Sequence, residues 1–232
     1  MLPIKDTIRS QSVPLVNWLI ILVNFLVFLY EISLPPLRLG LLINQYGLVP
    51  AHLNLADPFT WGALFTHMFL HGGWLHILSN MWVLFIFGDN VEDRLGSVRY
   101  LLFYLTGGIL AGLVQIFFST DALTPSIGAS GAIAAVLGGY FSFYPRSKVI
   151  TLIPIFIIPW FVELPSFVFL GFWFITQLFQ GLIALTTPNG QAVGGVAWWA
   201  HIGGFIFGLL FVRLFAIGHT VPRWHSDQFW PW

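Results

Sequence analysis

The chain has 232 residues, of which 57% are hydrophobic and only 8% are charged, and its formal net charge is zero. Soluble domains usually carry about a quarter charged residues, so these few charges cannot cover a water-facing surface of this size. The composition therefore excludes an ordinary soluble domain, and the zero net charge argues against a nucleic-acid partner. The chain contains no cysteine, which excludes disulfides and thiol chemistry.

Six apolar runs reach or approach the length of about 20 residues that a membrane-spanning helix needs. They cover residues 16–34, 62–88, 98–118, 130–144, 165–186 and 195–216. We expect an all-α fold, a polytopic membrane protein built as a bundle of six transmembrane helices, with one domain over residues 1–232. Short tails are expected at residues 1–15 and 217–232. A further apolar piece, residues 150–160, is broken by two prolines; we expect an interfacial or loop segment there, and a seventh span stays open.

The basic residues predict the orientation of these spans. Eight of the nine lie on one side of a six-span chain: Lys5, Arg9, Arg94, Arg99, Arg146, Lys148, Arg213 and Arg223. We therefore expect a multi-pass protein of the plasma membrane, the bacterial inner membrane, with both termini in the cytoplasm. The first run is interpreted as a retained span rather than a signal peptide, because a long polar segment precedes it. The tail tryptophans Trp224, Trp230 and Trp232 suit a membrane interface.

Polar side chains inside a membrane are costly and are by default candidates for function. The candidates that stand out in the apolar runs are His67, His71, His76, Asn80, Ser130, Gln177, Gln180 and His201. Those in the second, fourth and sixth runs all lie in the outer half of their expected helices. They could therefore meet in one water-accessible cavity.

Ser130 and His201 are the pair that this pattern favours as nucleophile and base. A serine hydroxyl reacts only when a neighbouring base removes its proton, and neutral histidine is such a base near pH 7. The small residues in GASGAIAAVLGG and AHIGGFIFG would let the two helices approach closely, and Gly128 and Gly131 leave room beside Ser130. The alternative is that Ser130 is one more small packing residue and His201 a structural hydrogen-bonding group.

His76 and Asn80 are four residues apart and so share one face of a helix, where both could stabilise an oxyanion together with the N–H of Ser130. The alternative is that they only tie this helix to its neighbours. His67 and His71 have a spacing that can bind zinc, with His76 as a third ligand, but no adjacent glutamate is present. No metal and no cofactor are expected, and His67 and His71 are expected to stabilise the outer end of the second helix.

Taken together, these stretches resemble the rhomboid family of intramembrane serine proteases over nearly the whole chain. The matching segments are HMFLHGGWLHILSNMWVLFIFGDNVEDRLGS, GASGAIAAVLGGY, YPRSKV and AHIGGFIFG. The resemblance implies that Ser130 is the nucleophile, His201 the base, and His76 and Asn80 the oxyanion-binding pair. It implies that His71 supports the site, and that Glu92 and Arg94 form a structural pair. A tyrosine found in some bacterial members is replaced by Ala134, which leaves the orientation of His201 open.

The resemblance also implies partners, namely the lipid bilayer and transmembrane protein substrates that are cut in or near a membrane helix. The leading hypothesis is thus an intramembrane serine endopeptidase with a Ser130–His201 dyad. Asp121 falls in an external loop and Glu163 before the fifth run, so the sequence offers no carboxylate as a third catalytic member. A catalytically inactive membrane chaperone or scaffold of the same fold is the main alternative. A small-solute transporter ranks last, because paired broken helices with midplane charges are not evident.

Overall fold

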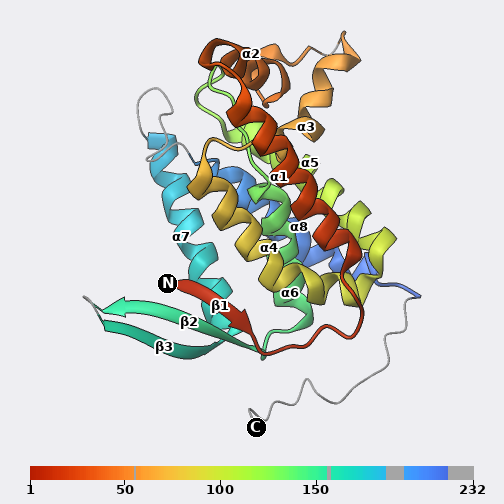
Figure 1. Ribbon diagram of the computed structural model, residues 1–232, viewed down its shortest axis with the longest axis vertical. Coiled ribbons are helices and arrows are strands. Elements are labelled where there is room, and N and C mark those ends of the chain that lie inside the picture. Colours follow the sequence, from red (N-terminus) through yellow and green to blue (C-terminus); the bar gives the residue numbers. More distant parts are fainter. Residues whose placement is uncertain (55, 156–157, 187–195, 219–232) are drawn as a thin grey trace.

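The computed structural model describes residues 1–54, 56–155, 158–186 and 196–218 and is dominated by helices (Figure 1). The long helices are α1 (Leu15–Ser33), α4 (Trp74–Leu95), α5 (Ser97–Phe118), α6 (Ser130–Phe143), α7 (Ser166–Thr186) and α8 (Trp198–Phe215). Between α1 and α4 lie two shorter helices, α2 (Pro36–Tyr46) and α3 (Ala63–Thr66), with 3-10 turns at Pro50–His52, Pro58–Gly62 and His67–Phe69. The expected all-α membrane bundle is confirmed.

Four of these helices, α1, α5, α7 and α8, are long and apolar enough to cross a membrane. The segment Pro58–Phe69 followed by α4 would count as a fifth span if this bent pair crosses as one unit. Helix α6 has only 14 residues, fewer than a full crossing needs. The polytopic architecture is therefore established for the described residues, whereas the count of six spans stays a prediction.

The second apolar run is not the single helix that we expected. It is broken between Phe69 and Trp74, where the chain turns by 82° before α4 begins. The adjacent Gly72 and Gly73 explain the break, because two successive glycines favour a bend over a continuous helix. Glu31, buried in α1, holds the bend in place: both of its carboxylate oxygens accept the backbone N–H of His71, at 3.2 and 3.1 Å.

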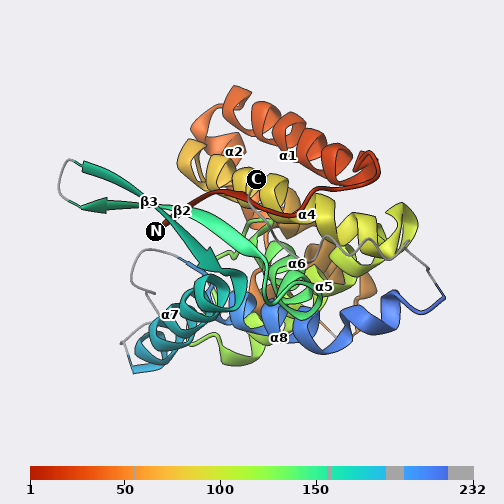
Figure 2. The same ribbon diagram turned by 90° about the horizontal axis from the view of Figure 1, so that it is seen from below.

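Helix α6 lies at the centre of the bundle, with α4, α5 and α8 packed around it (Figure 2). Every residue from 131 to 140 is buried. The closest approach is between α6 and α8: a side-chain carbon on Gly204 would collide with the carbonyl oxygen of Gly131, and one on Gly208 with that of Ala135. The small residues therefore bring the two backbones into direct contact, as small-residue motifs do in membrane helices.

One end of the bundle, which we call the sheet end, carries a small antiparallel sheet in the order β1 (Leu2–Asp6), β2 (Lys148–Ile155), β3 (Ile158–Pro165) (Figure 1). The described residues of the interfacial or loop segment expected at 150–160 thus belong to two paired antiparallel strands, β2 and β3. The many β-branched residues in KVITLIPI favour a strand, and Pro154 pairs with Pro159 near the end of the two paired strands. The opposite end, which carries α2, is called the loop end.

Glu92 joins the N-terminus of α1 to α4 at the sheet end. Its carboxylate accepts the backbone N–H groups of Val16 and Asn17, at 3.1 and 2.7 Å, and the hydroxyl of Ser97 at 2.5 Å. Because these N–H groups belong to the first turn of α1, a buried carboxylate from another helix acts as its cap. Arg94 instead lies over the rings of Phe143 and Tyr144.

The remaining expectations for the C-terminal tail, including its three tryptophans, concern residues 219–232 and lie outside the described residues. Of the described basic residues, Arg38 lies in α2 at the loop end, and others lie at the sheet end. Arg213 donates to Ser142 at the end of α6, Arg99 donates to the carbonyl of Ile217, and Lys148 pairs with Glu163 in the sheet.

Candidate functional site

Ser130 is the first residue of α6, and the loop before it is held by backbone hydrogen bonds. Leu48 and Ser126 exchange two such bonds, at 3.0 and 2.9 Å, and the N–H of Gly128 donates to the carbonyl of His67 at 2.9 Å. Gly128 has φ +124°, a conformation that residues with a side chain rarely adopt. The turn at Gly128 therefore places Ser130 at a helix N-terminus facing the loop end of the bundle.

His201 lies on α8 beside this helix start. A side-chain carbon on Gly131 would be 3.4 Å from Cβ of Ala200 and 3.7 Å from its carbonyl oxygen, so the residue after Ser130 adjoins the residue before His201. The N–H of Ala200 donates to Oε1 of Gln115 in α5 at 3.2 Å. The structure thus brings the two predicted helices together at the depth of Ser130 and His201.

The ring of His201 is buried, and three side chains hold it. Its Nδ1 atom lies 2.8 Å from Oε1 of Gln177 in α7. The ring of Trp173 is tilted at 32° with a centroid separation of 5.9 Å, and the ring of Trp198 meets it edge-on at 6.1 Å. These contacts orient the ring of His201, which Ala134 cannot do in place of the tyrosine found in some bacterial members.

His76 and Asn80 approach the same loop from α4. A side-chain carbon on Gly128 would lie 2.7 Å from Nε2 of His76 and 3.8 Å from Nδ2 of Asn80. The N–H of Gly72 donates to Nδ1 of His76 at 3.3 Å, so the neutral ring carries its hydrogen on Nε2, the atom nearest Gly128. Nδ2 of Asn80 is buried and has no hydrogen-bond partner among the described residues. Two donors therefore face the turn that precedes Ser130.

His67 and His71 do not lie on one helix with His76, which corrects the expected spacing. His67 lies in the 3-10 turn, where its Nδ1–H donates to the carbonyl of Ala63 at 2.8 Å. His71 lies in the bend, with its ring 5.0 Å from that of His76. No group of three His, Cys, Asp or Glu side chains able to hold a metal ion is found within the described part of the chain.

The carboxylate of Asp121 is directed to its own loop. It accepts the hydroxyl of Thr124 at 2.5 Å and the N–H of Leu123 at 2.8 Å. These hydrogen bonds stabilise the charged form, with that from Thr124 the strongest, and lower the pKa of Asp121. Asp121 therefore does not serve as the partner of His201, whose ring contacts Gln177 instead.

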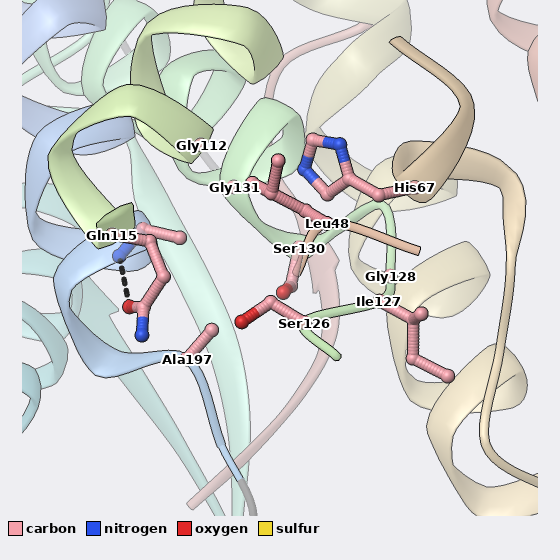
Figure 3. A pocket seen from close by; sticks show the side chains of 11 residues that line it. Leu48, His67, Gly112, Gln115, Ser126, Ile127, Gly128, Ser130, Gly131 and Ala197 are labelled. Carbon is pink, nitrogen blue, oxygen red and sulfur yellow. Dashed lines mark hydrogen bonds between the residues drawn. The ribbon is translucent and has the colours of Figure 1, made fainter. Parts of the chain in front are cut away.

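A small pocket opens beside Ser130 (Figure 3). The hydroxyls of Ser126 and Ser130 lie near each other and point toward the side of the pocket where Ala197 and Gln115 lie. The full lining is Leu48, His67, Gly112, Gln115, Ser126, Ile127, Gly128, Ser130, Gly131, Ala197 and Ala200. Most of these side chains are small, and the lining does not include His201, His76 or Asn80.

Several of these residues were missed by the sequence analysis. Gln177 was noted as polar but given no role, and Glu31, Gln115 and Ser126 were given none. Glu31 could have been found, because an ionisable residue within an apolar run is itself a signal. The contact between Gln177 and His201 joins separate helices, and no local pattern predicts it.

Comparison with known proteins gives one family. The model of the rhomboid domain matches residues 58–217. The presenilin-associated rhomboid-like protein A, mitochondrial, of Danio rerio is 31% identical over 153 residues, 62% of this chain and 35% of that protein. The presenilin-associated rhomboid-like protein, mitochondrial, of Homo sapiens is 27% identical over 179 residues, which are 74% of this chain and 41% of that protein. RHOMBOID-like protein 1 of Arabidopsis thaliana is 32% identical over 178 residues, which are 77% of this chain and 40% of that protein.

This chain thus spans about two fifths or less of the length of these relatives. Several of them are named as mitochondrial proteins, including RHOMBOID-like protein 6, mitochondrial, of Arabidopsis thaliana. These names contradict the expected location in a bacterial plasma membrane with both termini in the cytoplasm, and that prediction is wrong. The multi-pass membrane architecture agrees with the family match, and the chain belongs to the rhomboid family.

Proposed function

We propose that this chain is an intramembrane serine endopeptidase that hydrolyses peptide bonds in or near the transmembrane segments of membrane proteins. Ser130 is the nucleophile and His201 the base. The observation that carries the proposal is the contact of α6 with α8 at Gly131 and Ala200, which sets the two side chains on adjoining backbones. Family membership alone would leave open the inactive scaffold, since a fold does not imply a function.

In the first half of the reaction, Nε2 of His201 takes the hydroxyl proton of Ser130 as Oγ attacks the carbonyl carbon of the substrate. The carbonyl oxygen becomes an oxyanion. His76 Nε2–H, Asn80 Nδ2–H and the backbone N–H of Ser130 are the donors available near Gly128 to bind it. The peptide C–N bond then breaks, and His201 gives its proton to the leaving amine, which leaves an ester on Ser130.

In the second half, a water molecule gives a proton to His201 and attacks the ester carbonyl. The oxyanion forms again at the same donors. When the C–O bond to Ser130 breaks, the proton returns from His201 to Oγ, and the new carboxyl end departs. A substrate helix must unwind locally for this, because its carbonyls are otherwise hydrogen-bonded within the helix.

The test is cleavage of a fluorogenic transmembrane peptide by the purified protein in liposomes. Ser130→Ala and His201→Ala should each abolish cleavage. Two exposed residues offer matched controls: Ser33→Ala, at the end of α1, and His52→Ala, in a 3-10 turn, should cleave at the wild-type rate. Cleavage that survives in both site variants contradicts the dyad. Tight peptide binding without cleavage, over a panel of varied peptides, favours the scaffold.

A further inference from the structure

The amide of Gln177 is the one polar side chain in hydrogen-bond contact with the ring of His201 among the described residues. Gln177 is buried in α7, and it does not line the pocket beside Ser130. Its contact with the candidate site is the hydrogen bond to the ring of His201, so we expect Gln177 to act on the reaction through that ring.

The orientation of this amide follows from its other contacts. Nε2 of Gln177 donates to the carbonyl of Trp173 at 3.3 Å and to the hydroxyl of Thr176 at 3.1 Å. The carbonyl can only accept, and the Thr176 hydroxyl already donates to that same carbonyl at 2.6 Å. The nitrogen of the amide must therefore face Trp173 and Thr176, which leaves Oε1 to face His201.

The tautomer of His201 follows in turn. Oε1 of Gln177 can only accept, so Nδ1 of His201 must carry a hydrogen to satisfy the 2.8 Å contact. A neutral imidazole has one hydrogen, and with Nδ1 protonated the free lone pair is on Nε2. The chain of bonds from Trp173 through Gln177 thus prepares Nε2 to receive a proton.

We propose that Gln177 is the positioning residue of the catalytic base: it fixes the tautomer and ring orientation of His201, which has no carboxylate partner among the described residues. Trp173 and Trp198 confine the ring, while Gln177 selects which nitrogen is basic. The inference rests on the proposed function, since it assigns His201 the role of base.

The kinetic test compares three substitutions at 177 with a matched control. Gln177→Leu removes the acceptor and should lower kcat at least about tenfold with little change in KM, because general acid–base catalysis is worth about 100- to 10,000-fold. Gln177→Glu keeps the acceptor and should restore most of kcat. Gln177→Met, which keeps the length but not the acceptor, should resemble Gln177→Leu. Gln180, one turn from 177 and only partly buried, supplies the control Gln180→Leu, expected to act like wild type.

The pH profile separates positioning from a merely structural role. A carboxylate at 177 stabilises the imidazolium of His201, so Gln177→Glu should reach half-maximal kcat at a higher pH than wild type. His76 is the titratable group whose charge acts on His201, and it is unchanged in every variant. Loss of kcat in Gln177→Glu equal to that in Gln177→Leu, with no pH displacement, would overturn the proposal, as would equal kcat in Gln177→Leu and Gln180→Leu.

A second readout does not depend on activity. Nitrogen-15 NMR of histidine-labelled protein in micelles, with His201 assigned by comparison with His201→Ala, reports the tautomer directly. The proposal predicts hydrogen on Nδ1 in the wild type and a mixed population in Gln177→Leu. Hydrogen on Nε2 in the wild type contradicts it. If the predicted tautomer is found but the wild type cleaves nothing, the proposed function fails while the link between Gln177 and His201 stands.

Discussion

The carbonyl oxygen of Gly131 in α6 lies against the Cα atom of Gly204 in α8, with no space for a side chain between them. This contact lies one residue after Ser130 and three residues after His201, so the backbone approach and the position of the candidate dyad are parts of one feature. A bulkier residue at Gly204 would separate the two helices.

Gly204→Ala should lower both stability and activity, because its methyl group would collide with a backbone oxygen that cannot move aside. Overpacking of this kind costs about 1–3 kcal/mol. Thermal unfolding in detergent and peptide cleavage measure the two effects. Gly171→Ala in α7 is the matched control: nothing lies within 4 Å of its added carbon, so it should be neutral or slightly stabilising.

Gly128→Ala should reduce cleavage by at least tenfold, for two reasons. The methyl group would be 2.7 Å from Nε2 of His76, and the φ of +124° is strained for alanine at a cost of about 1–3 kcal/mol. Gly72→Ala has ordinary contacts, 3.8 Å from His76, and should keep near-normal activity. Equal activity of the two variants would show that the turn at Gly128 is not part of the site.

Asn80→Ala should lower kcat without lowering stability. Its Nδ2 atom is buried and unpartnered among the described residues, so removing it leaves no acceptor unsatisfied. Removal of an oxyanion donor typically costs about 100- to 1,000-fold in kcat. Asn44→Ala in α2, an exposed site, serves as the control for both measurements. A marked drop in melting temperature with kcat retained would favour the alternative in which Asn80 only ties helices together.

Glu92→Ala should destabilise the protein by about 2–5 kcal/mol, because one buried and two partly buried donors lose a charged acceptor. Glu163→Ala removes the same side chain from an exposed pair with Lys148 and should change stability by less than about 1 kcal/mol. Thermal and denaturant unfolding of the two variants in the same detergent compare these effects. Similar losses would mean that Glu92 does not cap α1 as described.

Asp6 should make stability depend on pH. Its carboxyl receives hydrogen bonds from Tyr140 at 2.6 Å and Asn90 at 3.0 Å, yet burial, with a smaller contribution from the nearby Asp89, raises the pKa of Asp6 to about 7. The folded protein therefore binds this proton more tightly than the unfolded chain does. The resulting stability is fully present below about pH 4 and is lost as the pH rises through about 7.

Asp6→Asn removes this titration and so isolates it from that of other groups. Between about pH 5 and pH 8, the melting temperature of the wild type should fall by more than that of Asp6→Asn. Identical pH dependences of the two proteins would contradict the assignment.

The sequence was sufficient for the family and for the membrane bundle, because long apolar runs and small-residue motifs are local patterns. The bend before Trp74 and the pairing of β2 with β3 were missed, although Gly72, Gly73 and the β-branched run carry signals for both. The hydrogen bond between Gln177 and His201 could not be predicted from the sequence, because the register of α7 against α8 depends on tertiary packing. The location was predicted wrongly, since a charge pattern gives the side of a membrane but not which membrane.

The central claim, that Ser130 is a nucleophile activated by His201, is tested most directly by locating a covalent label. The protein is treated with a fluorophosphonate in liposomes, digested, and the modified residue is identified by mass spectrometry. The account predicts modification at Ser130 in the wild type and in Ser33→Ala, and none at that position in His201→Ala. Labelling of another residue, or undiminished labelling of Ser130 in His201→Ala, would contradict it.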